Sequence, residues 1–325
     1  QKHEDILSYD EIVRLCRCFA TLGINKIKLT GGEPLVRKGL ANLVRMVKGI
    51  DGIKSVTLTT NGILLKDQLP ELMEAGLDGV NISLDTLDPN SYERITRSNV
   101  LSNVLAGLKE ALRYEELNVK INCVPIPGLN KEDILSIAQL AKDSRLSVRF
   151  IEMMPIGLGK QYPFYSEDSI LEELESIYGQ LQICESKLGN GPAHYYSIPG
   201  FVGKIGFISA ISHKFCDECN RVRLTSDGFL KTCLQYAEGT DLKYIVRATN
   251  EDSELEQAIR QTIFRKPKSH QFSECYDSSQ EPDKNVMVGI SEKDSKHLGD
   301  NTCKDTERGE VNAMYEQRQM SCIGG

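Results

Sequence analysis

Short runs rich in β-branched residues alternate with longer amphipathic stretches through the first half of the chain. The strand-like runs are residues 24–30, 55–60, 79–84, 119–125 and 147–152. The helical patterns are residues 7–19, 40–47, 67–75, 100–114 and 131–142. Strands alternating with helices at intervals of roughly 25 to 40 residues favour βαβ units and a parallel sheet. We therefore predict an α/β fold, a partial (β/α)6 TIM-like barrel whose sixth strand would precede residue 1, with chemistry at the carboxyl ends of the strands.

The pattern changes after residue 152. A helix at 166–178, short strands at 193–198, 204–209 and 221–225, and a last helix at 251–264 predict an α+β extension. Residues 273–310 are charged, poor in aromatic residues and without period, which is typical of a mobile insertion. We predict a barrel over 1–152, an extension over 153–272, the insertion over 273–310, and a tail over 311–325 that ends in Gly-Gly.

Composition excludes several classes of partner. The formal net charge is -7, so no basic field favours nucleic acid. No apolar stretch is long enough to span a bilayer, and no secretory signal opens the chain. Ten cysteines are scattered over a long α/β pattern, which favours reduced thiols. We expect a cytoplasmic protein, or one of the mitochondrial matrix if the source is eukaryotic, with no nucleic acid or membrane partner.

The cysteine segment, residues 215–234, carries the strongest chemical signal. Cys216 and Cys219 form a C-x2-C pair, and a turn at 226–228 would bring in Cys233. This spacing is typical of a metal site, and three cysteines leave one coordination position open. In a strand, Arg221 and Arg223 would point to the same face as a clamp for an anion, most simply a phosphate. Two alternatives stay open, namely a structural Cys3His zinc site that includes His213, and buried thiols in an ordinary hairpin.

Polar residues gather where the predicted strands end. Gly31, Gly32, Glu33 and Pro34 follow the first strand, and the glycines would let a ligand approach the backbone. Other polar side chains end or line the later strands: Thr59, Thr60, Asn61, Ser83, Asp85, Lys120, Asn122, Arg149 and Glu152. Cations would converge on one barrel mouth, which suggests a polyphosphate ligand. This predicted cation cluster comprises Lys28, Lys120, Arg149, Arg221 and Arg223.

Seven motifs resemble, in order, one family: the GTP 3′,8-cyclases, radical S-adenosylmethionine (SAM) enzymes of molybdenum cofactor biosynthesis. The motifs are GGEP at 31–34, NGILL at 61–65, SLD at 83–85, KINCV at 120–124, RFIEMMP at 149–155, GPAHYY at 191–196 and the cysteine segment. GGEP marks the wider superfamily, whereas the cysteine segment is specific to this family. The resemblance implies a barrel of the radical SAM type whose extension carries a second iron-sulfur cluster.

The resemblance also implies a reaction. A lyase of this family converts GTP to (8S)-3′,8-cyclo-7,8-dihydroguanosine 5′-triphosphate, the first step of molybdopterin synthesis. One [4Fe-4S] cluster, on a C-x3-C-x2-C loop, cleaves SAM to a 5′-deoxyadenosyl radical that takes hydrogen from C3′ of GTP, and the ribose radical attacks C8. A second [4Fe-4S] cluster, which by resemblance is held by Cys216, Cys219 and Cys233, binds the purine at its open iron.

Residue roles follow by matching motifs. The residues that the resemblance assigns to SAM are Gly31, Gly32, Glu33, Pro34, Ser83 and Met154. Those that it assigns to GTP are Lys28, Thr59, Lys120, Arg149, Arg221 and Arg223. Those that it assigns a catalytic role are Arg221, Arg223, Gly324 and Gly325, the last two in a tail that reaches the active site in the family.

Two departures from the family pattern stand out. Lysine occupies position 28, where the family often has arginine, which keeps the charge and loses the bidentate fork. The C-x3-C-x2-C motif does not occur, and Cys16 and Cys18 would face different sides of a helix and cannot replace it. Because the downstream motifs are all present, we expect an N-terminally truncated sequence, with the SAM-binding cluster present only if the missing motif is.

Alternatives to this activity also stay open. One is a non-catalytic nucleotide-binding protein with the zinc site described above, and another is a different radical SAM enzyme with an auxiliary cluster. For the cyclase, the expected partners are GTP, SAM, an electron donor, the downstream cyclic pyranopterin monophosphate synthase and a second copy of the chain in a homodimer.

Overall fold

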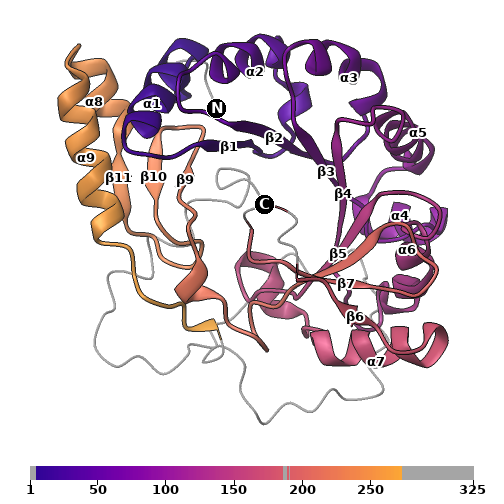
Figure 1. The fold of residues 1–325 in the computed structure, drawn as a ribbon. Helices are drawn as coiled ribbons and strands as arrows, with labels where there is room; N and C mark the ends of the chain where they lie inside the picture. The colour runs from indigo at the N-terminus through magenta and orange to yellow at the C-terminus, as the bar shows by residue number, and fades with distance from the viewer. Residues whose placement is uncertain (1–4, 186–188, 190, 273–325) are drawn as a thin grey trace, which may run out of the picture.

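The computed structural model describes residues 5–185, 189 and 191–272. In this part of the chain an eight-stranded sheet is strongly curved, with helices on its outer side (Figure 1). The strand order is β1-β2-β3-β4-β5-β8-β7-β6. Strands β1 to β5 and β8 pair in parallel, whereas β7 and β6 are antiparallel. The predicted partial barrel is confirmed.

The elements of the barrel follow the predicted order. Its strands are β1 (Lys26–Leu29), β2 (Ser55–Thr60), β3 (Gly79–Ser83), β4 (Asn118–Cys123), β5 (Ser147–Ile151), β6 (Gln182–Ile183), β7 (His194–Ser197) and β8 (Lys204–Ile208). Its helices are α1 (Tyr9–Thr21), α2 (Leu40–Lys48), α3 (Leu65–Glu74), α4 (Pro89–Thr96), α5 (Leu101–Ala111), α6 (Ile134–Gln139) and α7 (Glu167–Tyr178). Short 3-10 turns are η2 (Pro34–Val36), η3 (Lys131–Asp133), η4 (Gly157–Gln161) and η5 (Cys216–Glu218). None of the described helices is long and apolar enough to cross a membrane.

The two faces of the sheet differ because successive side chains of a strand point to opposite faces. Apolar residues of the outer face, such as Leu58, Ile82 and Val148, are fully buried against the helices. Each such side chain stabilises the fold by about 1.5–3 kcal/mol. The inner face carries polar residues that the register places side by side. One row across β3, β4, β5, β8 and β7 is Ser83, Asn122, Arg149, Gly206 and Tyr195.

The end of the described chain forms a second, smaller unit. It contains an antiparallel sheet of β9 (Arg223–Leu224), β10 (Phe229–Lys231) and β11 (Gly239–Asp241), with helices α8 (Leu242–Ala248) and α9 (Asp252–Phe264). Helix α1 packs against this unit and against the barrel helices, as the contact of α1 with α9, α8 and α2 in Figure 1 shows. Cys16 therefore lies in the barrel core and Cys18 in the second core, where it is buried with Leu230 and Ile259. The predicted divergence of the two cysteines is confirmed.

The structure differs from the sequence predictions at several elements. The sixth parallel strand of the described residues is β8, from the predicted extension, and its pairing with β5 crosses the predicted boundary at residue 152. Helix α4 was not predicted, although Asp88 caps it and Pro89 begins it. The helix predicted at 131–142 is shorter, because η3 precedes α6. Of the strand predicted at 221–225, only Arg223 and Leu224 form β9, so Arg221 precedes the strand.

Candidate functional site

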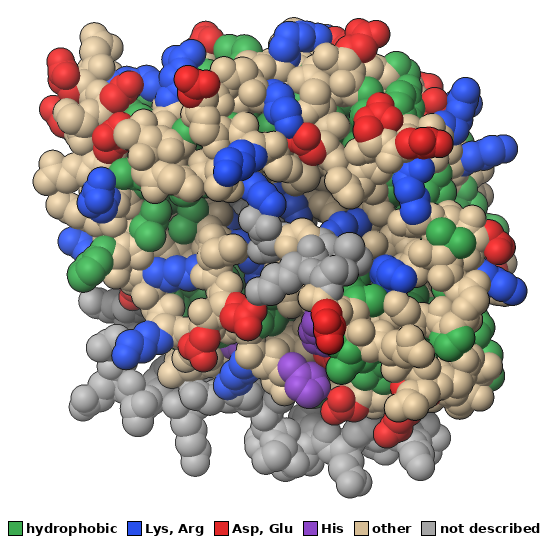
Figure 2. All heavy atoms as spheres, viewed as in Figure 1, with side chains coloured by type: hydrophobic (Ala, Val, Ile, Leu, Met, Phe, Trp, Pro, Cys, Tyr) green, Lys and Arg blue, Asp and Glu red, His purple; other side chains and the backbone are tan. Residues whose placement is uncertain are grey.

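Cations from both units meet at the open centre of the barrel. Lys28 lies on β1, Lys120 on β4 and Arg149 on β5, while Arg221 and Arg223 come from the cysteine segment. Figure 2 shows several Lys and Arg side chains near the middle of this face. The described part of the chain contains no ion pair between a carboxylate and Lys28, Arg149, Arg221 or Arg223. The structure thus brings the predicted cation cluster together, with positive charge left for an anionic ligand.

Lys28 shows how strongly the cations act on one another. The side chain of Lys28 is reached by solvent, although protein atoms surround most of it. Partial loss of hydration, followed by repulsion from Arg149, Arg221, Lys120 and Arg223, lowers the pKa of Lys28 to about 7. Burial and the charge of Arg221 also lower the pKa of Arg223. Cations held this close repel one another until an anion enters.

Arg149 is the most deeply buried member of the cation cluster, with 6% of its surface exposed. Its Nε donates to Asn122 Oδ1 at 2.9 Å, and its Nη2 donates to Asn81 Oδ1 at 2.7 Å. Lys120 Nζ donates to the hydroxyl of Tyr195 at 3.1 Å, and the same hydroxyl bonds the Arg149 guanidinium. Burial lowers the pKa of Arg149 and Tyr195 opposes that shift, while arginine stays charged in proteins.

The cysteine segment lies beside this cluster and is folded by a turn at its middle. Gly228 has φ +85°, a value that favours glycine, and its N–H donates to Thr225 at 2.9 Å. The turn pairs β9 with β10, so the chain that leads to Cys233 runs back along the residues that follow Cys219. Cys216, Cys219 and Cys233 are all half-buried free thiols.

Residues from beyond α9 contact these thiols. Lys266 Nζ donates to Cys219 O at 2.5 Å, to Arg221 O at 2.9 Å and to Cys219 Sγ at 3.4 Å. The backbone N–H of His270 lies 3.4 Å from Cys216 Sγ. Burial opposes ionisation of Cys219, but the N–H and charge of Arg221 and the charge of Lys266 together lower its pKa. A thiolate is the form that binds a metal.

Within the described residues, the three cysteines do not form a site for a single metal ion. No group of three or more His, Cys, Asp or Glu within the described residues converges on one point as a mononuclear site requires. A [4Fe-4S] cube binds each cysteine through a different iron, so its three thiolates need not converge in that way. His213, the fourth ligand of the zinc alternative, lies instead 3.3 Å from Asp168 Oδ1. In the described residues His213 therefore does not join the three cysteines as a zinc ligand.

The GGEP loop combines an open side and a fixed side. A Cβ built at Gly31 or Gly32 meets no atom within 4 Å, so the backbone there is open to a ligand. The Glu33 carboxylate accepts from Thr60 Oγ1 at 2.8 Å, Asn61 N at 2.7 Å and Leu35 N at 3.0 Å. Most of its acceptor capacity ties the loop to β2, a role that sequence reasoning did not assign. Pro34 begins η2 and is buried.

The other predicted SAM and GTP residues lie at strand ends. Ser83 is exposed at the end of β3, and Met154 is half-buried just after β5. Gly159 packs tightly on the backbone of Met154, and a larger residue at position 159 would require the backbone to shift. Thr59 Oγ1 accepts from Asn81 Nδ2 at 3.2 Å, which links it to Arg149 through one side chain. Gly324 and Gly325, and the predicted segments 273–310 and 311–325, lie outside the described residues.

Two polar side chains of the site were missed, or were noted without a role. Asn81 was not predicted, and Asn122 was noted only as a polar residue on a strand. Both stand in strands whose other residues are largely apolar, and both fall on the inner face. A polar residue at an inward position of a buried strand was the signal available, because such groups require hydrogen-bond partners.

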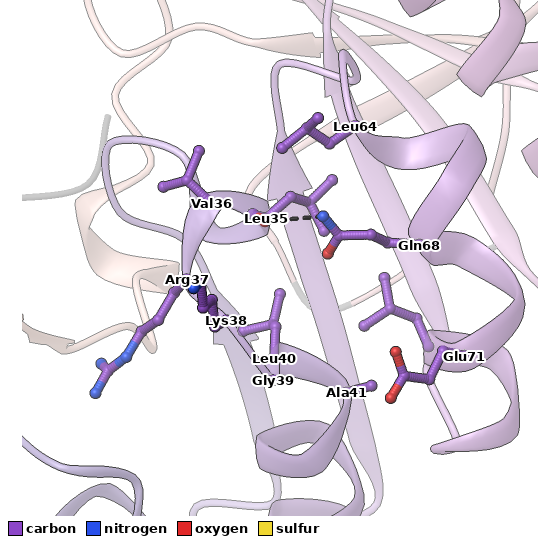
Figure 3. Close-up of a pocket in the computed structure, with 11 residues that line it drawn as sticks. Leu35, Val36, Arg37, Lys38, Gly39, Leu40, Ala41, Leu64, Gln68 and Glu71 are labelled. Atoms are coloured by element: carbon purple, nitrogen blue, oxygen red, sulfur yellow. Dashed lines mark hydrogen bonds between the residues drawn. The ribbon is translucent and has the colours of Figure 1, made fainter.

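A cavity of about 500 Å³ lies elsewhere. Figure 3 shows that it lies between the 35–41 segment and α3, where Gln68 Nε2 donates to Leu35 O at 2.9 Å. None of the predicted site residues lines it. The candidate site is therefore the mouth of the barrel, where the cation cluster and the cysteine segment meet.

Comparison with known proteins agrees with this architecture. Residues 1–141 match the family model of the Radical SAM superfamily, and residues 146–272 match that of Molybdenum Cofactor Synthesis C. Among solved structures, coproporphyrinogen III oxidase from Escherichia coli, a radical SAM enzyme, is 15% identical at a TM-score of 0.41, over 53% of this chain and 45% of that chain, a likeness too slight to carry an argument.

Curated relatives are much more similar. A GTP 3′,8-cyclase of Clostridium perfringens (strain 13 / Type A) is 44% identical over 271 residues, which are 83% of this chain and 84% of that protein. A GTP 3′,8-cyclase of Alkaliphilus oremlandii is 41% identical over 271 residues, 82% of each chain. One from Thermodesulfovibrio yellowstonii is 40% identical over 267 residues, 82% of this chain and 83% of that protein. The chain therefore belongs to the GTP 3′,8-cyclase family of radical SAM enzymes.

Proposed function

We propose that this chain catalyses the conversion of GTP to (8S)-3′,8-cyclo-7,8-dihydroguanosine 5′-triphosphate, a lyase reaction that begins molybdenum cofactor synthesis. One observation carries the proposal. The cation cluster joins residues of β1, β4 and β5 with two arginines of the cysteine segment. In the described part of the chain Lys28, Arg149, Arg221 and Arg223 have no carboxylate partner. A triphosphate would supply the missing negative charge, and we expect the nucleoside to extend toward the cysteine segment.

The chain's own residues would act mainly by binding and orienting. Lys28, Lys120, Arg149, Arg221 and Arg223, with Thr59, would hold the triphosphate and ribose. Cys216, Cys219 and Cys233 would hold a [4Fe-4S] cluster, whose fourth iron is left open for the purine. For Cys219, the charges of Arg221 and Lys266 lower the thiol pKa, which supports ligation as a thiolate.

SAM would lie against the GGEP loop. The open side of Gly31 and Gly32 would admit its methionyl end, with Glu33 and Pro34 shaping the loop and Ser83 and Met154 at neighbouring strand ends. SAM, when bound with a reduced [4Fe-4S] cluster, would supply the radical chemistry that activates GTP. The C-x3-C-x2-C ligands of that cluster are not among the 325 residues. We assign Gly324 and Gly325 a catalytic role on the family motif alone.

Further partners follow from this reaction. An electron donor must reduce the SAM-binding cluster, and a cyclic pyranopterin monophosphate synthase would consume the product. We also propose a homodimer and a cytoplasmic location, or the mitochondrial matrix in a eukaryote. Nucleic acid is not an expected partner at a net charge of -7.

The test of the proposal is GTP binding and metal content. The protein should be brown and contain iron and sulfide after anaerobic purification, and Arg221→Ala or Arg223→Ala should weaken GTP binding at least tenfold. Arg113→Ala is a matched control, because Arg113 is an exposed arginine that pairs with Glu110 on the outer surface. Colourless protein with stoichiometric zinc, or unaltered GTP binding in both site variants, would contradict the cyclase proposal.

A further inference from the structure

The hydrogen-bond partners of Arg149 in the described structure are all neutral groups. Its nitrogens donate to Asn122 Oδ1 at 2.9 and 2.5 Å and to Asn81 Oδ1 at 2.7 Å. The hydroxyl of Tyr195 is its third partner. Asn81 and Tyr195 are as buried as Arg149, with 5% and 3% of their surfaces exposed. A buried arginine is ordinarily paired with a carboxylate, so this arrangement requires an explanation.

Both asparagines turn their oxygen ends toward the guanidinium, and the orientation of Asn81 is fixed by its other bonds. Asn81 Nδ2 donates to Leu58 O at 3.3 Å and to Thr59 Oγ1 at 3.2 Å. A flip that turned the amide nitrogen toward Arg149 would break both bonds. Asn122 is the direct cross-strand neighbour of Arg149 on β4. Both acceptors therefore come from strands whose register is set by the barrel core.

The other side of Arg149 is shaped to leave room for this network. Gly206 is the β8 neighbour of Arg149 and the partner of Tyr195 on β7. A Cβ at Gly206 would lie 2.7 Å from the ring of Tyr195 and 3.1 Å from Cγ of Arg149. Glycine at this position thus lets the tyrosine ring and the arginine stem pack over the same strand.

The choice of neutral acceptors has an electrostatic consequence. An aspartate at position 81 or 122 would satisfy the guanidinium with a stronger, charge-assisted bond, but it would cancel the positive charge. Amide oxygens satisfy the same N–H groups and leave the full charge in a site of reduced dielectric, where it acts strongly on an anion. The cost is the burial of an uncompensated cation next to Lys28 and Arg221. That cost is recovered when an anionic ligand binds.

We propose that Asn81 and Asn122 are positioning residues that hold Arg149 without neutralising it, so that its charge is retained for the triphosphate of the bound nucleotide. This inference rests on the proposed function, because it takes GTP as the anion. It assigns a purpose to two side chains that contact the guanidinium and to which no ligand role was given. It also predicts that the neutrality of the side chains at positions 81 and 122 matters more for GTP binding than their shape.

The test replaces each asparagine by its isosteric acid in the full chain, purified and reconstituted anaerobically. Asn81→Asp and Asn122→Asp should each weaken GTP binding at least tenfold in equilibrium titrations, because the new carboxylate forms an internal ion pair with Arg149. A purely structural role predicts the opposite outcome, since aspartate would hold Arg149 at least as firmly and binding would be unaltered.

Two controls separate charge from shape. Asn42→Asp is the matched surface control, because Asn42 Oδ1 also accepts from an arginine, Arg45, at 2.9 Å on exposed α2. It should leave GTP binding within about twofold. Asn122→Ala removes the acceptor without adding charge and should weaken binding less than Asn122→Asp. If Asn122→Ala weakens binding as much as Asn122→Asp, the asparagine acts by shape and the inference is wrong.

The outcomes also separate this inference from the proposed function. Thermal unfolding of each variant shows whether it is folded, and half-buried Asn122 carries the test if Asn81→Asp does not fold. Wild-type protein that fails to bind GTP would overturn the proposed function. Wild-type protein that binds GTP, beside a folded Asn122→Asp variant that binds it equally well, would overturn the inference alone.

Discussion

The barrel sheet and the cysteine segment hold their functional side chains in different ways. In the sheet, Lys120 and Arg149 stand on strands of six and five residues whose register is fixed by a fully buried outer face. In the cysteine segment, Arg223 stands on a strand of two residues that pairs with one of three. Its neighbours are positioned by the Gly228 turn and by donors such as Lys266 from beyond α9.

This difference indicates a division of labour within one site. Side chains on regular elements with a locked register are positioned more accurately than those on loops. The sheet therefore supplies a preformed charge, whereas the proposed cysteine ligands stand on a segment with little regular structure. The predictions below contradict or refine this division, beginning with the largest expected effect.

Each region contains a glycine at which a Cβ would have no room, and replacing these two glycines compares the stability of the regions most directly. Gly203 precedes β8, and a Cβ there would collide with the carbonyl oxygen of Leu146. Gly239 begins β11, and a Cβ there would collide with that of Leu230. We expect Gly203→Ala to lower the free energy of unfolding of the whole chain by about 3 kcal/mol or more. Gly239→Ala should loosen the small sheet and reduce retained iron, with a smaller effect on the barrel.

Urea unfolding followed by circular dichroism measures the first effect, and iron content after gel filtration measures the second. Gly191→Ala is the control, because a Cβ at Gly191 meets no atom within 4 Å. If Gly239→Ala destabilises the whole fold as much as Gly203→Ala does, the two regions unfold as one unit. The barrel sheet and the cysteine segment would then differ in their position in the fold but not in their stability.

Glu33 tests how firmly the sheet fixes a loop. Glu33→Ala removes the acceptor of Asn61 N, Leu35 N and Thr60 Oγ1. Because the first two are backbone donors and the acceptor is charged, we expect a loss of about 2 kcal/mol in the free energy of unfolding. Thermal and urea unfolding measure it, with exposed Glu71→Ala on α3 as the control. An unchanged unfolding free energy would mean that the GGEP loop does not depend on this carboxylate.

Lys28 links the two regions through charge and should respond to pH. Its pKa of about 7 lies below that of an ordinary lysine, so it loses its proton as pH rises from 6 to 8. Losing one cation should weaken GTP binding by about tenfold over this range, which titrations at each pH measure. Lys28→Arg should abolish the dependence on pH, because arginine does not titrate. A dependence that persists in Lys28→Arg would assign it to another group.

The same group affects stability in a defined direction. Because the pKa of Lys28 is lower in the folded state than in the unfolded chain, the unfolded chain binds more protons between about pH 7 and the ordinary lysine pKa. The contribution of Lys28 to the free energy of unfolding therefore rises with pH through that window. Lys28→Met should remove this rise.

The sheet side of the site was largely predictable from sequence. Alternation of apolar and polar residues gave the strands, and the carboxyl ends of parallel strands lie at one edge, so Lys120 and Arg149 could be expected to meet. The partners of Arg149 were harder to identify, since Asn81 lies 68 residues away and only the register of two intervening pairings brings it close. An asparagine within a buried strand was the one available clue.

The cysteine segment was less predictable. The spacing of its cysteines indicated a metal site, yet Arg221 proved to precede the strand, and His213 contacts Asp168 rather than the thiols. The bond from Lys266 to Cys219 joins residues 47 positions apart and has no periodic signature. Contacts made by loops depend on tertiary packing that local patterns do not encode.

The smallest expected effect concerns helix α1, which connects the two regions. Arg14 Nε pairs with Asp252 Oδ1 at 2.8 Å, but the acid is half-exposed, and Arg14 Nη1 also donates to Val246 O at 2.9 Å and Thr249 O at 2.7 Å. Asp252→Asn removes only an exposed ion pair at the start of α9, so we expect a loss below about 1 kcal/mol, measured by thermal unfolding. Arg14→Met also deprives the end of α8 of its donor and should cost more. Equal losses in the two variants would mean that the ion pair, rather than the bonds to α8, connects α1 to the second unit.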